Sequence, residues 1–190
     1  MIEKQFGSLT PKTIIAMLII TAKVMFFRIS VIGSYDDTNR GLWHSINAAI
    51  LLAALFTFYP ALAASPTLFV ASVLIRLIGI ILFLLIAHGM LKRVGKQDKF
   101  LVFSVPFIWI ENMQQFLGGI IQNLMLLTGD FSIFLLILPI AIWSIYWLWR
   151  VARDIVFEGG FFAAVLVAIS MIIDVGLLAV VQSMTGGIGG

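Results

Sequence analysis

Long apolar segments separated by short polar connections run through most of the sequence. A helix needs about 20 apolar residues to cross the ~30 Å hydrocarbon core of a bilayer, and five segments reach about that length. They lie approximately at 42–63, 67–91, 100–127, 131–149 and 159–184. The pattern predicts an all-α fold, a polytopic membrane helix bundle with five transmembrane helices.

The segment before the first span has a different character. Residues 11–30 are apolar but carry Lys12, Lys23 and Arg28, and their uninterrupted apolar core covers only 14–22. We therefore expect an N-terminal amphipathic helix lying in the cytoplasmic interface of the membrane. A sixth span is an alternative, but it would bury Lys23 near mid-membrane at a cost of roughly 2.5–3.5 kcal/mol. A secretory signal is a weaker one, because no small-residue cleavage site follows the apolar run.

The composition agrees with a membrane protein. Apolar residues make up 62% of the chain and charged residues 11%, and the mean hydropathy is +1.12. A soluble domain is about 45–50% apolar and about 25% charged. The lipid bilayer must therefore be the main partner of the surface. No nucleic-acid partner is expected, since no basic patch is interleaved with exposed aromatic residues.

Lysine and arginine are confined to alternate connections. Of the twelve, eleven lie before the first span, at 92–99 or at 150–158, and none lies in the other connections or the tail. Cytoplasmic loops are enriched in these residues, so we expect a multi-pass protein of the inner membrane with a cytoplasmic N-terminus and a periplasmic C-terminus. The chain then divides into a cytoplasmic segment with the interfacial helix (1–40), a five-helix transmembrane domain (41–185) and a flexible glycine-rich tail (186–190).

Three ionisable residues lie inside the predicted spans: Arg76, Glu111 and Asp174. The helix rise of about 1.5 Å per residue places them roughly 14, 13 and 8 Å below the outer face. Unpaired charges are expensive in a membrane, so we expect Arg76 to pair with a carboxylate, and Glu111 matches its depth better. The second carboxylate would then be free for a cation or a proton. A structural charge cluster that fixes the helix register is the alternative.

The third span is the most polar. Its residues Glu111, Gln115 and Gln122 share one face. Amide side chains in membrane helices hydrogen-bond to neighbouring helices, so this face should point into the bundle, either as interhelical contacts or around a water-filled cavity. The candidate binding cluster inside the membrane consists of Arg76, Glu111, Asn112, Gln114, Gln115 and Asp174.

The fifth span carries small residues at every fourth position. Gly160, Ala164 and Ala168 would lie on one face of a helix. Such a face allows close approach of another helix. We expect it to pack inside the bundle, or against a partner chain.

No signature of catalysis is present in the sequence. It has no HExxH, no Walker lysine loop and no G-x-S-x-G. With no cysteine and two histidines, it also offers no disulfide, thiolate site or multi-histidine metal site. We therefore predict a protein that is not an enzyme, with no catalytic residue, no metal and no cofactor.

Three stretches carry a resemblance to a known family. They are RGLWHSINAAILLAAL at 40–55, KRVGKQDKFLVFSVPFIWIENMQQ at 92–115 and IAIWSIYWLWRVARDI at 140–155. In these stretches and in its predicted five-span layout the chain resembles the Yip1 family, particularly its short bacterial members. The DLYGP-type motif of the eukaryotic trafficking members is absent, so no Rab or vesicle-transport role follows. The resemblance implies a helical membrane scaffold or adaptor and supplies no catalytic residues.

Three hypotheses of function fit these features of the sequence. The leading hypothesis is a non-enzymatic membrane scaffold or adaptor that acts through helix contacts with other membrane proteins or with itself. The alternative is a small transporter or ion-coupled permease that uses Arg76, Glu111 and Asp174, although no internal repeat of the kind found in many transporters is evident. An accessory subunit of a larger membrane complex is a further possibility.

Overall fold

The computed structural model describes residues 9–63 and 66–186 of the chain. These residues are almost entirely helical and include no strand, which confirms the all-α fold class. The helices are α1 (Pro11–Met25), α2 (Asn39–Ala63), α3 (Pro66–Arg93), η1 (Gln97–Lys99), α4 (Phe100–Thr128), η2 (Phe131–Leu136), α5 (Ile137–Val156) and α6 (Gly159–Gly186). Except for its first residue, the predicted flexible tail at 186–190 lies outside the described residues.

Four stretches of the described chain are long and apolar enough to cross a membrane. They are Asn39–Phe58 in α2, Phe69–Arg93 in α3, Phe131–Val156 in η2 and α5, and Gly159–Val180 in α6. These four identify a multi-pass membrane protein. The 29-residue α4 is long enough to join them, but its glutamate and its side-chain amides make it less apolar.

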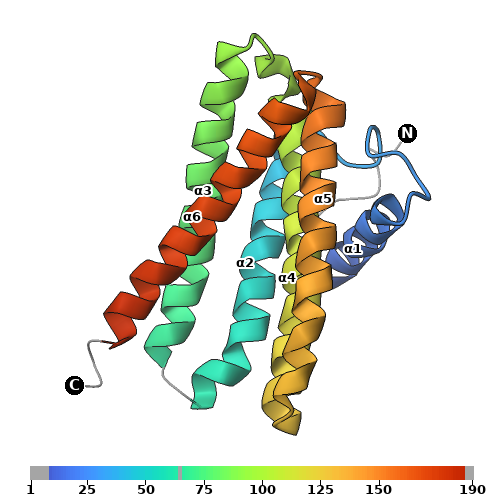
Figure 1. The fold of residues 1–190 in the computed structure, drawn as a ribbon. Coiled ribbons are helices and arrows are strands. Elements are labelled where there is room, and N and C mark those ends of the chain that lie inside the picture. The colour runs from blue at the N-terminus through green and yellow to red at the C-terminus, as the bar shows by residue number, and fades with distance from the viewer. Residues whose placement is uncertain (1–8, 64–65, 187–190) are drawn as a thin grey trace.

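The polar character of α4 is explained by its position at the centre of the bundle. The helix lies between α2 and α5 (Figure 1) and packs against both. Every residue from Phe103 to Met113 is buried. Because its neighbours here are other helices, α4 can carry groups that lipid would not accept.

The remaining long helices form the other side of the bundle. Helices α3 and α6 pack against each other, and α6 starts beside α5 and diverges from it toward its own C-terminal end (Figure 1). Large apolar side chains on their outer faces are exposed, as in Leu85 at 65% and Ile172 at 70%. Lipid contact accounts for such faces in a membrane protein.

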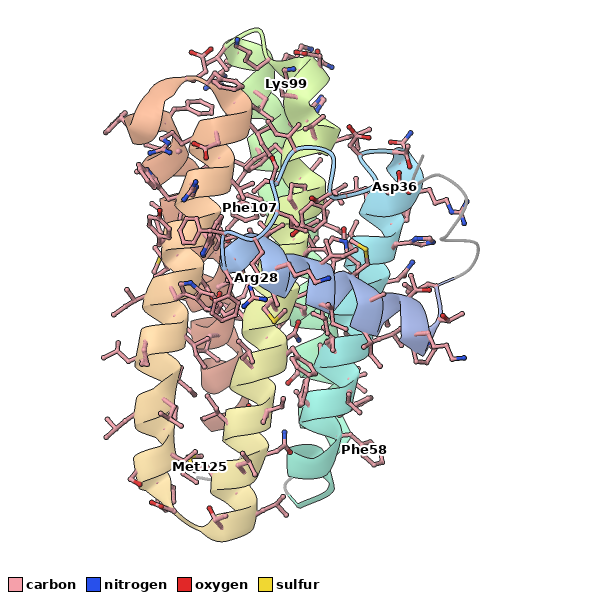
Figure 2. The ribbon with its side chains drawn as sticks, turned by 90° about the vertical axis from the view of Figure 1, so that its right-hand side faces the viewer. Arg28, Asp36, Phe58, Lys99, Phe107 and Met125 are labelled. Atoms are coloured by element: carbon pink, nitrogen blue, oxygen red, sulfur yellow. The ribbon has the colours of Figure 1, made fainter. Side chains whose placement is uncertain are left out.

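Helix α1 lies across the bundle. Figure 2 shows it crossing α4 instead of running parallel to it, and its face with Met17, Leu18 and Val24 is buried. At its C-terminal end the rings of Phe26 and Phe27 contact those of two tryptophans of α5. A helix of 15 residues is roughly 22 Å long, too short to span the ~30 Å core. The sixth-span alternative therefore does not fit, and the interfacial location stays a prediction.

A buried phenol secures the segment that follows α1. The hydroxyl of Tyr35 donates a hydrogen bond to Thr21 Oγ1 over 3.2 Å, and Thr21 donates in turn to the carbonyl of Met17. Burial raises the pKa of Tyr35 above its usual range, against a smaller lowering by the hydrogen bond with Thr21. The phenol therefore remains a donor at physiological pH. Its hydrogen bond fixes the segment between α1 and α2 against α1.

The small-residue face of α6 does not pack as expected. Ala164 and Ala168 are exposed, so the expectation of internal packing is wrong for them. The buried face of α6 is instead formed by neighbouring positions that include Ala163, Leu166 and Val167. Ser170 lies on this buried face and donates to Glu111 of α4, and in lipid such interhelical hydrogen bonds direct a helix face inward where apolar burial does not.

Candidate functional site

An ion pair joins α3 to α4 inside the bundle. Arg76 Nη2 lies 3.1 Å from Glu111 Oε2, and the two side chains are only 17% and 10% exposed. The other carboxylate oxygen of Glu111 accepts a 2.8 Å hydrogen bond from Ser170 Oγ of α6. Glu111 thus joins α3, α4 and α6. The expected pairing of Arg76 with Glu111 is confirmed.

Asp174 lies on α6 next to this pair but does not join it. It is four residues beyond Ser170 and so shares its helix face. Arg76 and Glu111 are close enough to interact with it electrostatically. Among residues 9–63 and 66–186, no hydrogen bond or ion pair to Asp174 is formed, and the residue is exposed. The site therefore combines one neutralised pair with one available carboxylate.

The lack of a side chain at Gly79 lets Asp174 approach α3. A Cβ atom built on Gly79 would lie 3.6 Å from Asp174 Oδ1 and 3.2 Å from a methyl group of Leu177. The second distance is tighter than ordinary van der Waals contact. The glycine therefore sets how closely α6 can pack on α3 beside the ion pair.

A cleft of about 490 Å³ opens beside these residues, lined by side chains from α2, α3, α4, α5 and α6. Its wall on α5 is apolar and includes Ile140, Ala141 and Ile145. The volume falls within the range of roughly 300–1,000 Å³ typical of small-molecule pockets. We call it the polar cleft, after the charged and amide side chains in its lining: Arg76, Glu111, Gln114, Gln115, Gln122 and Asp174.

Two polar atoms at the polar cleft have no partner in the protein. Within the described part of the chain, Arg76 Nε and Gln115 Oε1 are buried without a hydrogen bond. Buried polar atoms are hydrogen-bonded in about nine cases out of ten. Both atoms are buried beneath the surface of the cleft, so they are unsatisfied groups of its wall and are not exposed to a solute.

Asn112 does not belong to the polar cleft, which corrects the candidate cluster. Its side chain is buried and donates from Nδ2 to the backbone carbonyl of Ser45 on α2 over 2.9 Å. Asn123, eleven residues further on, donates in the same way to the carbonyl of Phe56 over 3.2 Å. Eleven residues are close to three helical turns, so one face of α4 binds α2 through asparagines while another presents glutamines to the cleft.

The structure brings together five of the six candidate residues: Arg76, Glu111, Gln114, Gln115 and Asp174. It also adds Ser170, which had not been expected from the sequence. A single serine in an apolar span carries little signal by itself, but its spacing of four residues from Asp174 puts both on one face of α6. That spacing could have identified it.

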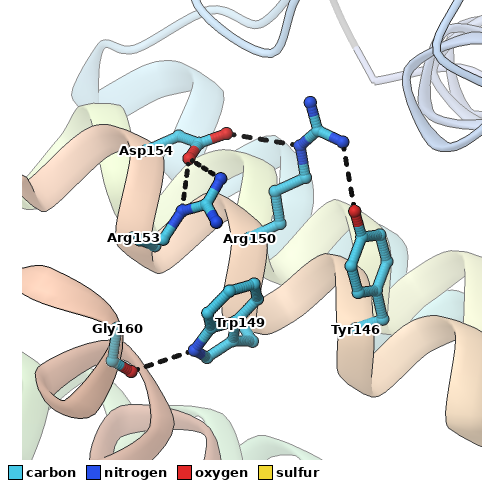
Figure 3. Close-up of polar contacts among 6 residues, drawn as sticks. All are labelled: Tyr146, Trp149, Arg150, Arg153, Asp154 and Gly160. Carbon is cyan, nitrogen blue, oxygen red and sulfur yellow. Dashed lines mark hydrogen bonds and ion pairs between the residues drawn. The ribbon is translucent and has the colours of Figure 1, made fainter.

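A second polar cluster lies near the α5–α6 turn (Figure 3), and none of its residues lines the cleft. The Nε1 atom of Trp149 donates to the carbonyl oxygen of Gly160 over 2.9 Å. Arg150 and Arg153 both bind Asp154, at 3.3 and 2.7 Å. The Trp149 contact ties the start of α6 to α5, whereas the contacts of Arg150 and Arg153 with Asp154 lie within α5.

No metal site is formed by the part of the chain that the structure describes, since no three histidine, aspartate or glutamate side chains gather closely enough to hold an ion. Comparison of the chain with protein families, curated proteins and solved structures finds no match. The resemblance to the Yip1 family therefore stays a prediction that rests on the sequence stretches that carry it.

Proposed function

We propose that this chain is a five-span membrane protein that binds a small polar solute in the polar cleft and acts as a small transporter or permease. The observation that carries the proposal is a cleft of about 490 Å³ among membrane helices, lined by charged and amide side chains. Ionisable groups are rare in membrane spans, and those that occur commonly mark solute or ion pathways. A purely structural ion pair needs no cleft beside it.

The proposed topology adds α4 as the fifth span and keeps α1 in the cytoplasmic interface. It rests on the distribution of lysine and arginine, which are absent from the connections at 64–66 and 128–130. The N-terminus is then cytoplasmic and the C-terminus periplasmic in an inner membrane. The cleft reaches Thr57 and Gln122, near the ends of α2 and α4, so it belongs to the periplasmic half.

Reporter fusions test this topology. A periplasm-specific reporter after Gly190 is expected to be active, and a cytoplasm-specific reporter inserted at Gly95 is expected to be active, because both positions follow the lysine and arginine distribution. Activity of the opposite reporter type at either position would contradict the five-span arrangement.

Water access to the cleft is tested with single cysteines, because the chain has none of its own. Met171 lines the cleft, whereas the next residue, Ile172, is 70% exposed on the outer face of α6. In the intact membrane, Met171→Cys is expected to react with a charged, water-soluble thiol reagent at least about tenfold faster than Ile172→Cys, because a charged reagent enters the hydrocarbon region only at a large free-energy cost.

The comparison is matched, since the two positions are adjacent on one helix. Equally slow reaction at both positions would mean that water does not enter the cleft. The proposal that a solute binds there would then be wrong. Reaction rates are followed by a mass shift of the purified variants after timed exposure.

The scaffold and accessory-subunit hypotheses stay predictions from the sequence, as does the absence of enzymatic activity. Native purification in a mild detergent separates them from a transporter. A stoichiometric co-purifying membrane protein would favour a scaffold or a subunit, because either must hold its partner through helix contacts that survive extraction.

A further inference from the structure

The charges of the polar cleft do not cancel. Arg76 contributes one positive charge, and Glu111 and Asp174 contribute one negative charge each, so the three together carry a net charge of −1 when both acids are ionised. Arg76 is already bound to Glu111 at 3.1 Å. The remaining negative charge is that of Asp174, which has no hydrogen-bond or ion-pair partner within residues 9–63 and 66–186.

The contacts of Glu111 leave its carboxylate poorly placed to bind a solute cation. One of its oxygens binds Arg76 and the other accepts from Ser170. A solute cation would have to displace one of these partners to reach it. Asp174 can bind such a group without displacing anything, so it is the residue that sets the charge preference.

The dimensions of the cleft favour a molecule over a bare metal ion. Its volume is about 490 Å³, whereas one water molecule occupies roughly 30 Å³ of the liquid. The described residues also offer no group of three acidic or histidine side chains around a point. Glutamines and Phe56 also line the cleft, and amide and aromatic side chains are groups that suit an ammonium ion.

We infer that the polar cleft binds a small organic monovalent cation, an amine or quaternary ammonium compound, whose charge lies against Asp174. This inference rests on the proposed solute-binding function and names its ligand class. Arg76, Glu111 and Ser170 bind one another beside Asp174 and form a fixed part of the cleft wall. An anion would instead be repelled by the unbalanced carboxylate, since the arginine that lines the cleft is already neutralised.

The first test compares two thiol reagents on Met171→Cys in membranes. One is trimethylammonium-ethyl methanethiosulfonate, which is cationic, and the other is sulfonatoethyl methanethiosulfonate, which is anionic. The cationic reagent is expected to react roughly tenfold faster than the anionic one after correction for their intrinsic rates, because a cleft of one sign of charge concentrates the opposite sign. Adding Asp174→Asn should remove the preference, and adding Asp174→Glu should keep it.

The control variant is Asp98→Asn, which removes an exposed carboxylate of η1 that lies next to Lys99 and does not line the cleft. It should leave the preference unchanged. Equal rates for the two reagents, or a preference that survives Asp174→Asn, would overturn the cation inference while leaving solute binding intact. If neither reagent reacts, the cleft is closed to solutes, and the proposed function fails together with the inference.

The second test uses a ligand probe. Tetramethylammonium at millimolar concentration is expected to slow cationic labelling of Met171→Cys several-fold in a saturable manner, because it would occupy the space beside Asp174. Methanesulfonate at the same ionic strength should have no effect. Slowing by both salts, or by neither, would show that the cleft does not select organic cations.

Discussion

Replacement of Arg76 by leucine is expected to lower the thermal stability of the detergent-purified protein more than any other single change in the polar cleft. The substitution leaves the largely buried carboxylate of Glu111 without its cation, although Ser170 still donates to it. Breaking a buried ion pair by removing one partner typically costs about 3–5 kcal/mol in the free energy of unfolding. A fluorescence melting curve of wild type and variant measures the effect.

The double variant Arg76→Leu with Glu111→Gln should recover part of this loss. Glutamine is neutral, and its amide oxygen can still accept the hydrogen bond from Ser170. Arg76→Leu with Asp174→Asn is the matched control, because Asp174 interacts with Arg76 only through space and should give a smaller recovery. Strictly additive effects of Arg76→Leu and Glu111→Gln would show that the pair does not couple α3 to α4.

Gly119→Ala is the second substitution that is expected to lower the thermal stability strongly. Gly119 faces the ring of Phe56 on α2, and a Cβ atom at this position would overlap that ring. The ring is confined, since it also meets Phe116 at a centroid distance of 5.8 Å and the Phe56 carbonyl accepts from Asn123. Overpacking of this kind typically costs about 1–3 kcal/mol.

Gly118→Ala provides a closely matched comparison for that variant. The neighbouring glycine has no atom within 4 Å of its would-be Cβ, and alanine is favoured over glycine in a helix by about 1 kcal/mol. Gly118→Ala should therefore leave the melting temperature unchanged or raise it slightly. Equal destabilisation by both variants would mean that the glycines matter for the flexibility of α4 and not for contact with α2.

The long helices were predictable because their ends are marked in the sequence. The predicted segment 100–127 corresponds to α4 at Phe100–Thr128, and 159–184 corresponds to α6 at Gly159–Gly186. Charged or turn-forming residues lie at each of these ends, where the apolar run stops. The length and apolar character of the segments then leave few alternatives to a helix in lipid.

The faces of the helices were harder to predict, because nearly every position in a membrane helix is apolar. A hydrophobic residue on α6 is compatible with lipid and with the bundle interior alike, so the small-residue face pointed outward contrary to expectation. Asn112 lies only one residue from Glu111, yet one step along a helix turns a side chain by about 100°. That rotation is enough to send Asn112 to α2 while Glu111 meets Arg76.

The crossing of α1 over α4 could not be read from the sequence either. Its short apolar core and its cations argued against a span, but the direction of the helix depends on contacts that are remote in the chain. The rings of Phe26 and Phe27 meet Trp143 and Trp147, more than one hundred residues away. No local pattern encodes such a pairing.

The hydrogen bond between Trp149 and Gly160 fixes helices α5 and α6 to each other at their common turn. They are tied together at the turn and separate only further along (Figure 1). Asp174 lies 14 residues from Gly160 along α6, a lever arm of roughly 21 Å. A rotation of about 10° at the turn would therefore displace Asp174 by about 4 Å, more than the width of a water molecule. The same rotation would displace Ser170 by about 2.6 Å and break its hydrogen bond to Glu111, so this bond holds α6 against such a movement.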